Sequence, residues 1–206
     1  MAERAILVFA KAPEPGLAKT RLIPALGAEG AAALAERLLE HTLEAAASVA
    51  EAALELHCAP DCRHPLFRSL AVRHRLALRV QTGAGLGERM ATALEEALTR
   101  HRRVVLIGSD CPLMDAAYLE EAFSTLAGGQ DMVLGPAEDG GYVLIGTARP
   151  LSPLLFQGIA WGTEEVLSQT RERIRYLGIQ CRELEARPDL DRLEDLPLIR
   201  HVLAGD

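Results

Sequence analysis

Three positively charged side chains fall within one short segment, FAKAPEPGLAKTRL at residues 9–22. Lys11, Lys19 and Arg21 follow an apolar, strand-like run and are separated by prolines and a glycine. Ligands of open α/β sheets bind at the carboxyl ends of the strands, where a cation pairs well with a phosphate. The spacing therefore predicts a loop that holds nucleotide phosphates through side-chain charge. The alternative is a solvated basic loop without a ligand.

This loop differs from the Walker A phosphate loop. That motif needs G-x-x-x-x-G-K-[ST], whereas here Gly16 lies only three residues before Lys19. Pro13 and Pro15 also remove backbone N–H donors that such a loop needs. We therefore exclude a P-loop ATPase. We expect the prolines to stiffen the loop and Gly16 to let a ligand approach the backbone closely.

Asp110 is a candidate metal ligand. In VVLIGSDCP its carboxylate comes just past a buried strand, at the sheet edge where ligands bind. A carboxylate there could hold a divalent cation that bridges diphosphate oxygens and neutralises a leaving group. The alternative is a cap of a turn or helix, although Asp115 is the more obvious N-cap for the next helix.

The segment GPAEDGGYVLIG is a candidate acceptor site. Asp139 could accept hydrogen bonds from substrate hydroxyls, and Gly140 and Gly141 would leave room for a substrate against the backbone. The alternative is a plain hairpin turn, since Asp-Gly is a common hairpin signal.

A second acidic segment, RPDLDRLEDL, lies near the end of the chain. Asp189 and Asp191 come just before a predicted helix, and Asp191 with Glu194 would form a capping pair. The alternative is that a second carboxylate from this segment reaches the cation held by Asp110.

The segment QTGAGLGERM, residues 81–90, could line the same pocket. Its glycines follow the pattern G-x-G-x-G after the third predicted strand, which does not fit a Rossmann dinucleotide fingerprint. Gln81 and Arg89 are candidate contacts to a base or a phosphate.

The elements that position these residues alternate between apolar, β-rich runs and helical segments, a pattern typical of βαβ units. The expected strands are residues 4–10, 54–59, 76–81, 103–108, 131–137 and 142–148, with an extended segment up to 185. The expected helices are residues 28–50, 65–73, 87–101, 115–127, 163–175 and 192–203.

We therefore predict an α/β fold, a three-layer α/β/α sandwich around a mostly parallel mixed sheet. The four residues 138–141 are too few for a helical crossover, so at least one strand should be antiparallel. A chain of 206 residues fits a single domain, 1–206.

Composition excludes several classes of protein. A net charge of −7 argues against a nonspecific nucleic-acid binder, so any phosphate must be met locally. No run approaches the roughly 18 apolar residues of a membrane helix. Because no signal peptide is visible, we expect a cytoplasmic protein with reduced cysteines.

Together these motifs resemble the GT-A-type nucleotide-diphospho-sugar transferase superfamily. More narrowly, the chain is similar to a bacterial family of uncharacterised transferases that are associated with radical-SAM and selenoprotein domains. Members of this family are usually labelled glycosyltransferases. The matching segments follow the family's order and span nearly the whole chain: residues 11–22, 81–90, 107–114, 135–146, 159–167 and 189–196.

The resemblance implies a GT-A sheet and a nucleotide pocket formed by the first loop and the 81–90 segment. It further implies that Asp110 corresponds to the superfamily's metal-binding aspartate at the end of the fourth strand. Asp191 would correspond to the late Asp or Asn that completes the metal site, for Mg²⁺ or Mn²⁺, in related nucleotidyltransferases. One departure is that Cys111 and Pro112 follow Asp110. This D-x-P form resembles nucleotidyltransferases, whereas glycosyltransferases of this fold usually show D-x-D.

Our primary hypothesis is a metal-dependent, glycosyltransferase-like enzyme that binds a nucleotide-sugar and transfers the sugar to a small-molecule acceptor, with Asp110 and Asp139 as catalytic residues. The alternative is a nucleotidyltransferase that joins an NTP to a phosphorylated small molecule and releases pyrophosphate. A third hypothesis is a catalytically silent nucleotide-binding subunit. We expect no nucleic-acid partner and no membrane span, and the oligomeric state stays open.

Overall fold

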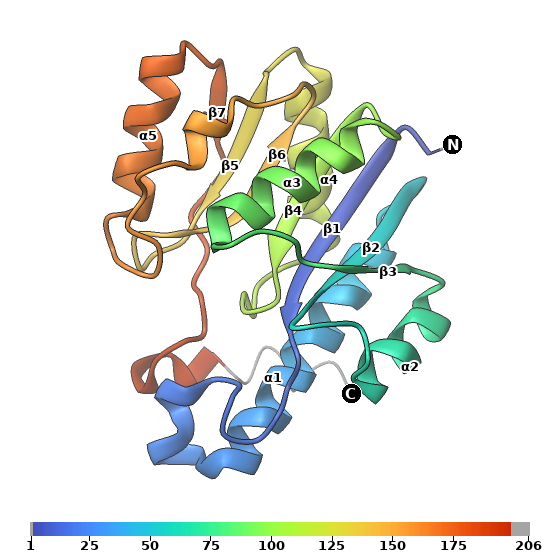
Figure 1. The fold of residues 1–206 in the computed structure, drawn as a ribbon, viewed down its shortest axis with the longest axis vertical. Helices are drawn as coiled ribbons and strands as arrows, with labels where there is room; N and C mark the ends of the chain where they lie inside the picture. The colour runs from blue at the N-terminus through green and yellow to red at the C-terminus, as the bar shows by residue number, and fades with distance from the viewer. Residues whose placement is uncertain (1, 199–206) are drawn as a thin grey trace.

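The computed structural model describes residues 2–198. In this range seven strands form one sheet in the order β3-β2-β1-β4-β6-β5-β7 (Figure 1). The strands are β1 (Arg4–Lys11), β2 (Ala52–Ala59), β3 (Ala77–Val80), β4 (Arg103–Gly108), β5 (Met132–Pro136), β6 (Tyr142–Thr147) and β7 (Cys181–Glu183). All six predicted strands are present, and β7 lies in the predicted extended segment.

Strand β6 gives the sheet its mixed character. It runs antiparallel to both neighbours, β4 and β5, whereas the pairs β1–β2, β1–β4, β2–β3 and β5–β7 are parallel. The connection from β5 to β6 is a tight turn, and such turns join antiparallel strands. The prediction of a mostly parallel mixed sheet with an antiparallel strand is therefore confirmed.

Helices cover both faces of the sheet and complete the three predicted layers (Figure 1). Helices α1, α2 and α4 pack on one face, and α3 and α5 pack on the other. The α-helices are α1 (Ile23–Ala47), α2 (Pro65–His74), α3 (Leu86–Leu98), α4 (Ala116–Ala127) and α5 (Val166–Leu177). The 3-10 helices are η1 (Thr20–Leu22), η2 (Pro153–Phe156) and η3 (Leu193–Leu198).

The core lies in two parts, one on each face of the sheet. Along β1, Ile6 and Val8 enter the first part, and Leu7 and Phe9 enter the second. This division follows from strand geometry, because successive side chains of a strand point to opposite faces. Strands buried on both faces explain why the runs in the sequence are apolar throughout.

The parallel pairing brings the ends of three strands to one edge of the sheet. Phe9 on β1 lies opposite Gly108 on β4, and Lys11 lies opposite Ala59 on β2. The loop after β1 and the loop after β4, which carries Asp110, therefore leave the sheet side by side.

The end of the described chain returns to this edge, where η3 lies beside the loop that follows β1 (Figure 1). Leu22, Leu38 and Leu190 are fully buried together there. The predicted helix 192–203 is a 3-10 helix over Leu193–Leu198, and residues 199–203 lie outside the described range.

Asp191 and Glu194 do not form the capping pair considered for this helix. Asp195 takes that role, because its carboxylate accepts the N–H groups of Asp191 and Arg192 at 3.0 and 2.7 Å. Asp115 caps α4 as expected and accepts from the N–H of Tyr118 at 2.7 Å. Within residues 2–198, every helix falls short of the length and apolar character that a membrane crossing requires.

Candidate functional site

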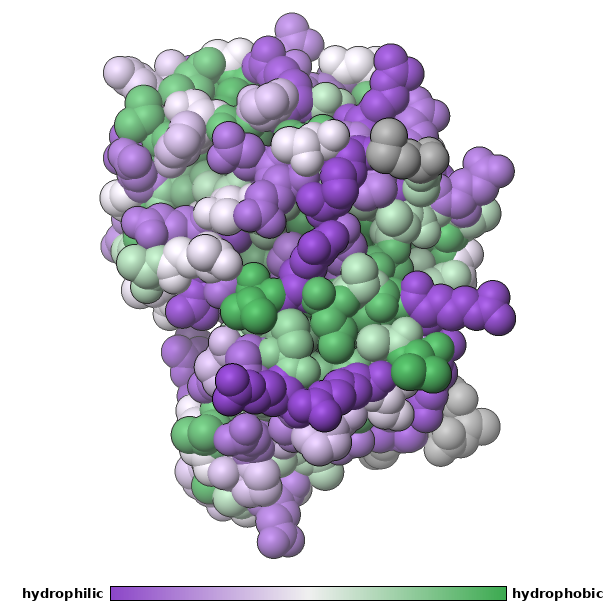
Figure 2. Space-filling view, turned by 45° about the vertical axis from the view of Figure 1, so that its right-hand side comes forward, coloured by the Kyte–Doolittle hydropathy of each residue, from purple (hydrophilic) through white to green (hydrophobic). Residues whose placement is uncertain are grey.

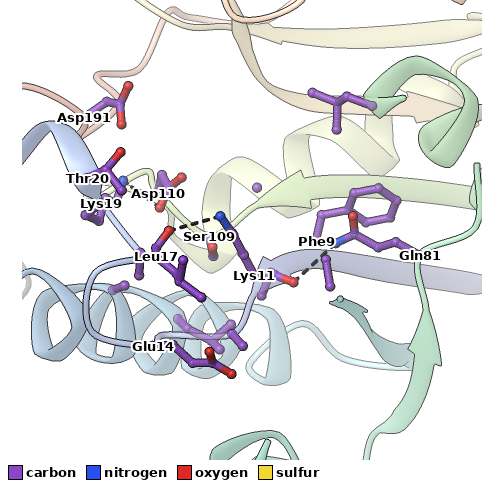
Figure 3. Close-up of a pocket in the computed structure, with 18 of the residues that line it drawn as sticks. Phe9, Lys11, Glu14, Leu17, Lys19, Thr20, Gln81, Ser109, Asp110 and Asp191 are labelled. Atoms are coloured by element: carbon purple, nitrogen blue, oxygen red, sulfur yellow. Dashed lines mark hydrogen bonds and ion pairs between the residues drawn. The ribbon is translucent and has the colours of Figure 1, made fainter. Parts of the chain in front are cut away.

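The loop from β1 to η1 is folded by its own backbone and by Lys11. The ammonium of Lys11 donates to the carbonyl oxygen of Leu17 at 3.0 Å (Figure 3). Gly16 has a φ of 82°, which glycine adopts without strain, and the space where its Cβ would lie is open. Gly16 therefore serves the turn, and neither it nor Pro13 lines the cavity that the loop borders.

Lys19 joins three segments that are far apart in the sequence. Its ammonium lies 2.7 Å from the carboxylate of Asp110 (Figure 3). It also donates to the carbonyl oxygen of Leu190. The side chain of Lys19 is only 5% exposed, whereas that of Asp110 is 45% exposed. An ammonium has three N–H donors, so one remains for a ligand.

Arg21 and Asp191 form a second ion pair next to the first. The backbone also ties the two acidic segments together, because the N–H of Leu190 donates to the carbonyl oxygen of Asp110 at 2.9 Å. The first loop, the β4 loop and the C-terminal segment thus meet at the sheet edge. Sequence reasoning predicted that these segments converge, but it did not predict which cation pairs with which carboxylate.

A cavity of about 960 Å³ opens between these segments, which we call the main pocket. Small-molecule sites commonly have volumes of roughly 300–1,000 Å³. The residues that were predicted to bind substrate or metal and that line the main pocket are Lys11, Lys19, Arg21, Gln81, Arg89, Asp110 and Asp191. Lys11 and Lys19 are also the only lysines in the sequence.

The main pocket has apolar surface as well as charge. Leu17 and Leu86 line it and are 53% and 45% exposed. On the face drawn in Figure 2, hydrophobic side chains gather in an area bordered by hydrophilic ones. A pocket with both kinds of surface suits a nucleotide, whose base is flat and whose phosphates are charged.

Gln81 is held in one orientation at the wall of the main pocket. Its side-chain N–H groups donate to the carbonyl oxygens of Ala10 and His57 at 3.3 and 2.9 Å. The amide oxygen is therefore left as an acceptor. Arg89 donates through Nε to the carbonyl oxygen of Gly83 at 3.1 Å, which fixes the turn before α3.

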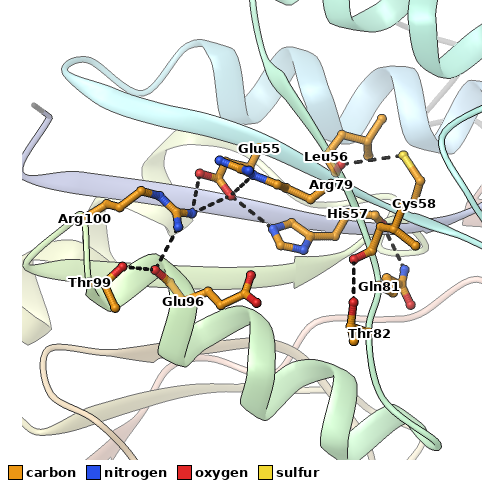
Figure 4. A network of polar contacts seen from close by, with 11 residues as sticks. Glu55, Leu56, His57, Cys58, Arg79, Gln81, Thr82, Glu96, Thr99 and Arg100 are labelled. Atoms are coloured by element: carbon orange, nitrogen blue, oxygen red, sulfur yellow. Dashed lines mark hydrogen bonds and ion pairs between the residues drawn. The ribbon is translucent and has the colours of Figure 1, made fainter.

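A buried network of charged side chains lies next to Gln81, around Glu55 and His57 on β2 (Figure 4). Glu55 is 5% exposed and accepts from Arg100 at 2.8 Å, and it also faces His57 and Arg79. Burial alone would raise the pKa of Glu55, but the hydrogen bonds from His57 and Arg100 and the nearby charges of Arg100 and Arg79 lower it to about 2. His57 in turn stacks on Phe9, with ring centroids 5.4 Å apart.

The Asp139–Gly141 turn joins β5 to β6, as the hairpin alternative proposed. The carboxylate of Asp139 accepts from the N–H of Gly141 at 3.0 Å. Gly140 has a φ of 91°, and a Cβ there would lie 2.3 Å from the carbonyl oxygen of Glu164. The space beside Gly140 is therefore filled by protein backbone, and Gly140 serves the packing of α5 instead of the predicted substrate.

Asp139 and Gly141 line another cavity, of about 260 Å³, which we call the second pocket. It adjoins the main pocket, since both are lined by Phe9, Arg21, Leu86, Gly108, Gly162 and Asp191. Asp139 therefore faces the second pocket together with Arg21 of the first loop, while Lys11 and Lys19 line only the main pocket.

Sequence reasoning gave too little weight to Asp189. One of its carboxylate oxygens is buried without a hydrogen-bond partner. Burial and the neighbouring charge of Asp110 raise the pKa of Asp189 to about 7, although Lys19 opposes the rise. The signal in the sequence was the alternation D-L-D, which places Asp189 and Asp191 on the same side of an extended segment.

These carboxylates fit a divalent cation. Mg²⁺ is commonly held by one or two carboxylates, with waters and substrate phosphates completing its shell. Asp110, Asp189 and Asp191 carry three negative charges, whereas Lys19 and Arg21 supply two positive ones. The carboxylate oxygen of Asp189 that has no hydrogen-bond partner could coordinate a cation. Among residues 2–198, no three acidic, His or Cys side chains converge closely enough to hold a metal by themselves.

Comparison with known proteins identifies a family and a fold. A family model described as "Uncharacterized protein conserved in bacteria (DUF2064)" matches residues 42–163. No curated protein matches the chain. A "putative nucleotide-diphospho-sugar transferase" from Desulfovibrio desulfuricans G20 is 33% identical, with a TM-score of 0.89 over 100% of this chain and 90% of that one.

More distant solved structures share the fold alone. CMP:2-keto-3-deoxy-manno-octonic acid synthetase complexed with CTP is 12% identical, with a TM-score of 0.60 over 98% of both chains. A 4-diphosphocytidyl-2C-methyl-D-erythritol synthase from Anaerococcus prevotii DSM 20548 is 12% identical, with a TM-score of 0.62 over 98% of this chain and 96% of that one. The chain thus has the nucleotide-diphospho-sugar transferase-like fold.

Proposed function

The chain belongs to the DUF2064 family of bacterial proteins, and we propose that it is a metal-dependent transferase that moves a sugar from a nucleotide-sugar to a small-molecule acceptor. The observation that carries the proposal is the meeting of Lys19 with Asp110 beside a cavity of nucleotide size. The similarity to the protein from Desulfovibrio desulfuricans G20 supports the same class of donor. An association with radical-SAM or selenoprotein domains stays a prediction.

The cations of the first loop bind the diphosphate of the donor. Lys19 keeps one N–H and Lys11 keeps two after their contacts within the protein. The guanidinium of Arg21 has five donors, and the pair with Asp191 leaves some of them available. All three side chains line the main pocket, so their charges act on one ligand.

Asp110 and the C-terminal aspartates hold a divalent cation, Mg²⁺ or Mn²⁺. Asp191, the predicted partner of Asp110, lines the main pocket with it, and the unpartnered oxygen of Asp189 makes that residue a further candidate ligand. A bound divalent cation supplies electrostatic stabilisation of the departing diphosphate, worth several kcal/mol in such sites.

The transfer step uses the carboxylate of Asp139 in the second pocket. The acceptor hydroxyl oxygen attacks the anomeric carbon of the sugar, and the bond from that carbon to the diphosphate oxygen breaks. The electron pair of the broken bond leaves with the nucleoside diphosphate. Asp139 takes the proton of the hydroxyl, and its exposed position lets the proton pass on to water.

A donor screen tests this proposal. Nucleotide-sugars are incubated with the protein and Mg²⁺ or Mn²⁺, and release of nucleoside diphosphate is measured. We expect release that EDTA abolishes and that Asp110→Asn lowers by about a hundredfold or more. Asp115→Asn is the matched control, because asparagine also caps helices well. Turnover that is unaffected by Asp110→Asn would contradict the proposal.

Nucleotidyl transfer remains the second candidate. Three cations on one pocket could also compensate a triphosphate, which carries more charge than a diphosphate-sugar. NTPs and phosphorylated acceptors are therefore assayed in parallel for pyrophosphate. Release of pyrophosphate, with no release of nucleoside diphosphate from nucleotide-sugars, would favour this candidate over sugar transfer.

A further inference from the structure

The second pocket differs in chemistry from the main pocket, and from this difference we infer the class of acceptor. We propose that the second pocket binds an uncharged, small hydroxylated molecule with an apolar face and rejects phosphorylated ones. The inference rests on the proposed sugar transfer, because it names the acceptor of that same site. Nothing in the chain's similarities specifies an acceptor.

The wall of the second pocket is aromatic and aliphatic. Tyr142 and Trp161 pack edge to face, with ring centroids 6.2 Å apart. Burial raises the pKa of Tyr142, so its phenol stays uncharged. The other apolar residues of the wall include Phe9, Leu86, Met90, Leu106, Val143 and Val166. Such a wall binds the C–H face of a sugar or another apolar face through burial.

The charged groups of the second pocket are mostly acidic. Asp139, Asp189 and Asp191 line it, and Arg21 is the sole Lys or Arg among its lining residues in the described chain. Arg21 is already paired with Asp191. With Asp191 paired to Arg21 and Asp189 assigned to the cation, a phosphate ester would meet Asp139 as a carboxylate whose charge no Lys or Arg of this pocket neutralises, and like charges at close range are unfavourable. A hydroxyl, by contrast, can donate a hydrogen bond to Asp139.

The volume and position of the second pocket also restrict the acceptor. At about 260 Å³ it is below the roughly 300 Å³ at which sites for drug-sized ligands begin. It meets the main pocket along a shared wall that includes Gly108 and Gly162. An acceptor of about monosaccharide size in the second pocket would therefore lie next to a donor in the main pocket.

Trp161 offers a direct measurement, because it is the only tryptophan and lines the second pocket but not the main one. Its fluorescence is titrated with three matched pairs: glycerol and glycerol 3-phosphate, glucose and glucose 6-phosphate, benzyl alcohol and benzyl phosphate. We expect at least one alcohol to change the fluorescence saturably and to bind about tenfold or more tighter than its phosphate ester. A phosphate ester that binds more tightly than its alcohol, or no response to any alcohol, would overturn the inference.

Two variants test whether charge causes the selectivity. Asp139→Asn removes one charge but keeps the oxygen that accepts from Gly141, so the turn is preserved. We expect it to narrow the difference between alcohol and ester several-fold. Glu138→Gln is the control, since Glu138 lies one residue away and does not line the second pocket. If Asp139→Asn discriminates between an alcohol and its phosphate ester as strongly as the wild type does, the negative charge of Asp139 is not the cause of the selectivity.

The outcome is separable from that of the proposed function. Nucleotide binding is measured by calorimetry on the same wild-type protein, and donor turnover is measured as above. Selective binding of alcohols without any donor turnover would refute sugar transfer and leave only the selectivity of the second pocket for uncharged alcohols standing. Donor turnover to phosphorylated acceptors would refute the acceptor class and leave transfer standing.

Discussion

The ammonium of Lys19 lies 2.7 Å from the carboxylate of Asp110, and Lys19 is the more buried partner of this pair. The exposed side of the pair is therefore the carboxylate, which a cation can reach. The ammonium sits behind it and is held by the carbonyl oxygen of Leu190. This arrangement places a fixed positive charge and an accessible negative charge side by side at one wall of the main pocket.

Lys19→Met should weaken nucleotide binding by about tenfold to a hundredfold, because a hydrogen bond to a charged group contributes about 1.5–3 kcal/mol. Isothermal calorimetry with a nucleoside diphosphate and Mg²⁺ measures the change. Lys11→Met is the matched comparison and should cost only about threefold, since Lys11 is exposed. Equal effects of the two substitutions would contradict the special position of Lys19.

The two lysines allow a labelling experiment without any mutation. We expect an amine-reactive ester to modify the exposed Lys11 much faster than Lys19, whose side chain is 5% exposed. A nucleotide with Mg²⁺ should slow the modification of both, because both line the main pocket. Mass spectrometry gives the rate at each lysine, and the α-amino group serves as the internal reference. Unprotected lysines at saturating nucleotide would place the nucleotide elsewhere.

Glu55 should make stability dependent on pH in acid. Its pKa is about 2 in the folded protein and 4.5 in the reference state. A lowered pKa means that the contribution is complete above pH 4.5 and is lost as pH falls from 4.5 toward 2. Glu55→Gln should lower the free energy of unfolding by about 3 kcal/mol at pH 7, because it leaves the partly buried Arg100 without its carboxylate partner. Urea unfolding measures this at pH 7 and pH 3. The free energy of unfolding should change less between these two pH values in Glu55→Gln than in the wild type.

Gly140→Ala should destabilise the protein by about 3 kcal/mol or more, because of the positive φ and the contact of 2.3 Å with Glu164. Gly141→Ala is the neighbouring control, since the nearest atom to its Cβ would be 3.3 Å away. Thermal unfolding followed by circular dichroism compares the two. If both variants unfold at the same temperature as the wild type, the close contact between Gly140 and Glu164 does not contribute to stability.

Asp189→Asn should stabilise the protein without metal and weaken its response to metal. The substitution removes a buried charge whose pKa is raised to about 7, so the gain should be largest at pH 8, about 1–3 kcal/mol. The same change should remove most of the Mg²⁺-dependent rise in melting temperature produced by a nucleotide. Retention of the full rise would show that Asp189 takes no part in holding the cation.

The sequence predicts most of the sheet because β1, β4, β5 and β6 are local, apolar runs between turn signals. The antiparallel β6 could also be predicted, since the connection of residues 138–141 is too short for a crossover. The short β7 was harder to place, because its residues are largely exposed and show little apolar alternation. The role of Gly140 could not be predicted, because its neighbour is the backbone of Glu164, brought close only by the tertiary fold.

The candidate site could be predicted in outline for a related reason. Lys11 ends β1 and Asp110 follows the end of β4, and parallel pairing of the two strands brings the loops that follow them to the same edge of the sheet. The pairing of Arg21 with Asp191 and the burial of Asp189 depend on how the C-terminal segment crosses the sheet edge. No local pattern specifies that path, so the buried, unpartnered oxygen of Asp189 could not be predicted.

The order in which the chain leaves the ribosome gives the C-terminal segment a timing role. All seven strands precede residue 187, and the carboxylates at 189 and 191 come after them. A nascent chain could therefore complete its sheet while Lys19 and Arg21 still lack Leu190 and Asp191. Ligand capture would begin only after residues 189–191 have joined this edge of the sheet, so formation of the sheet would precede formation of the site.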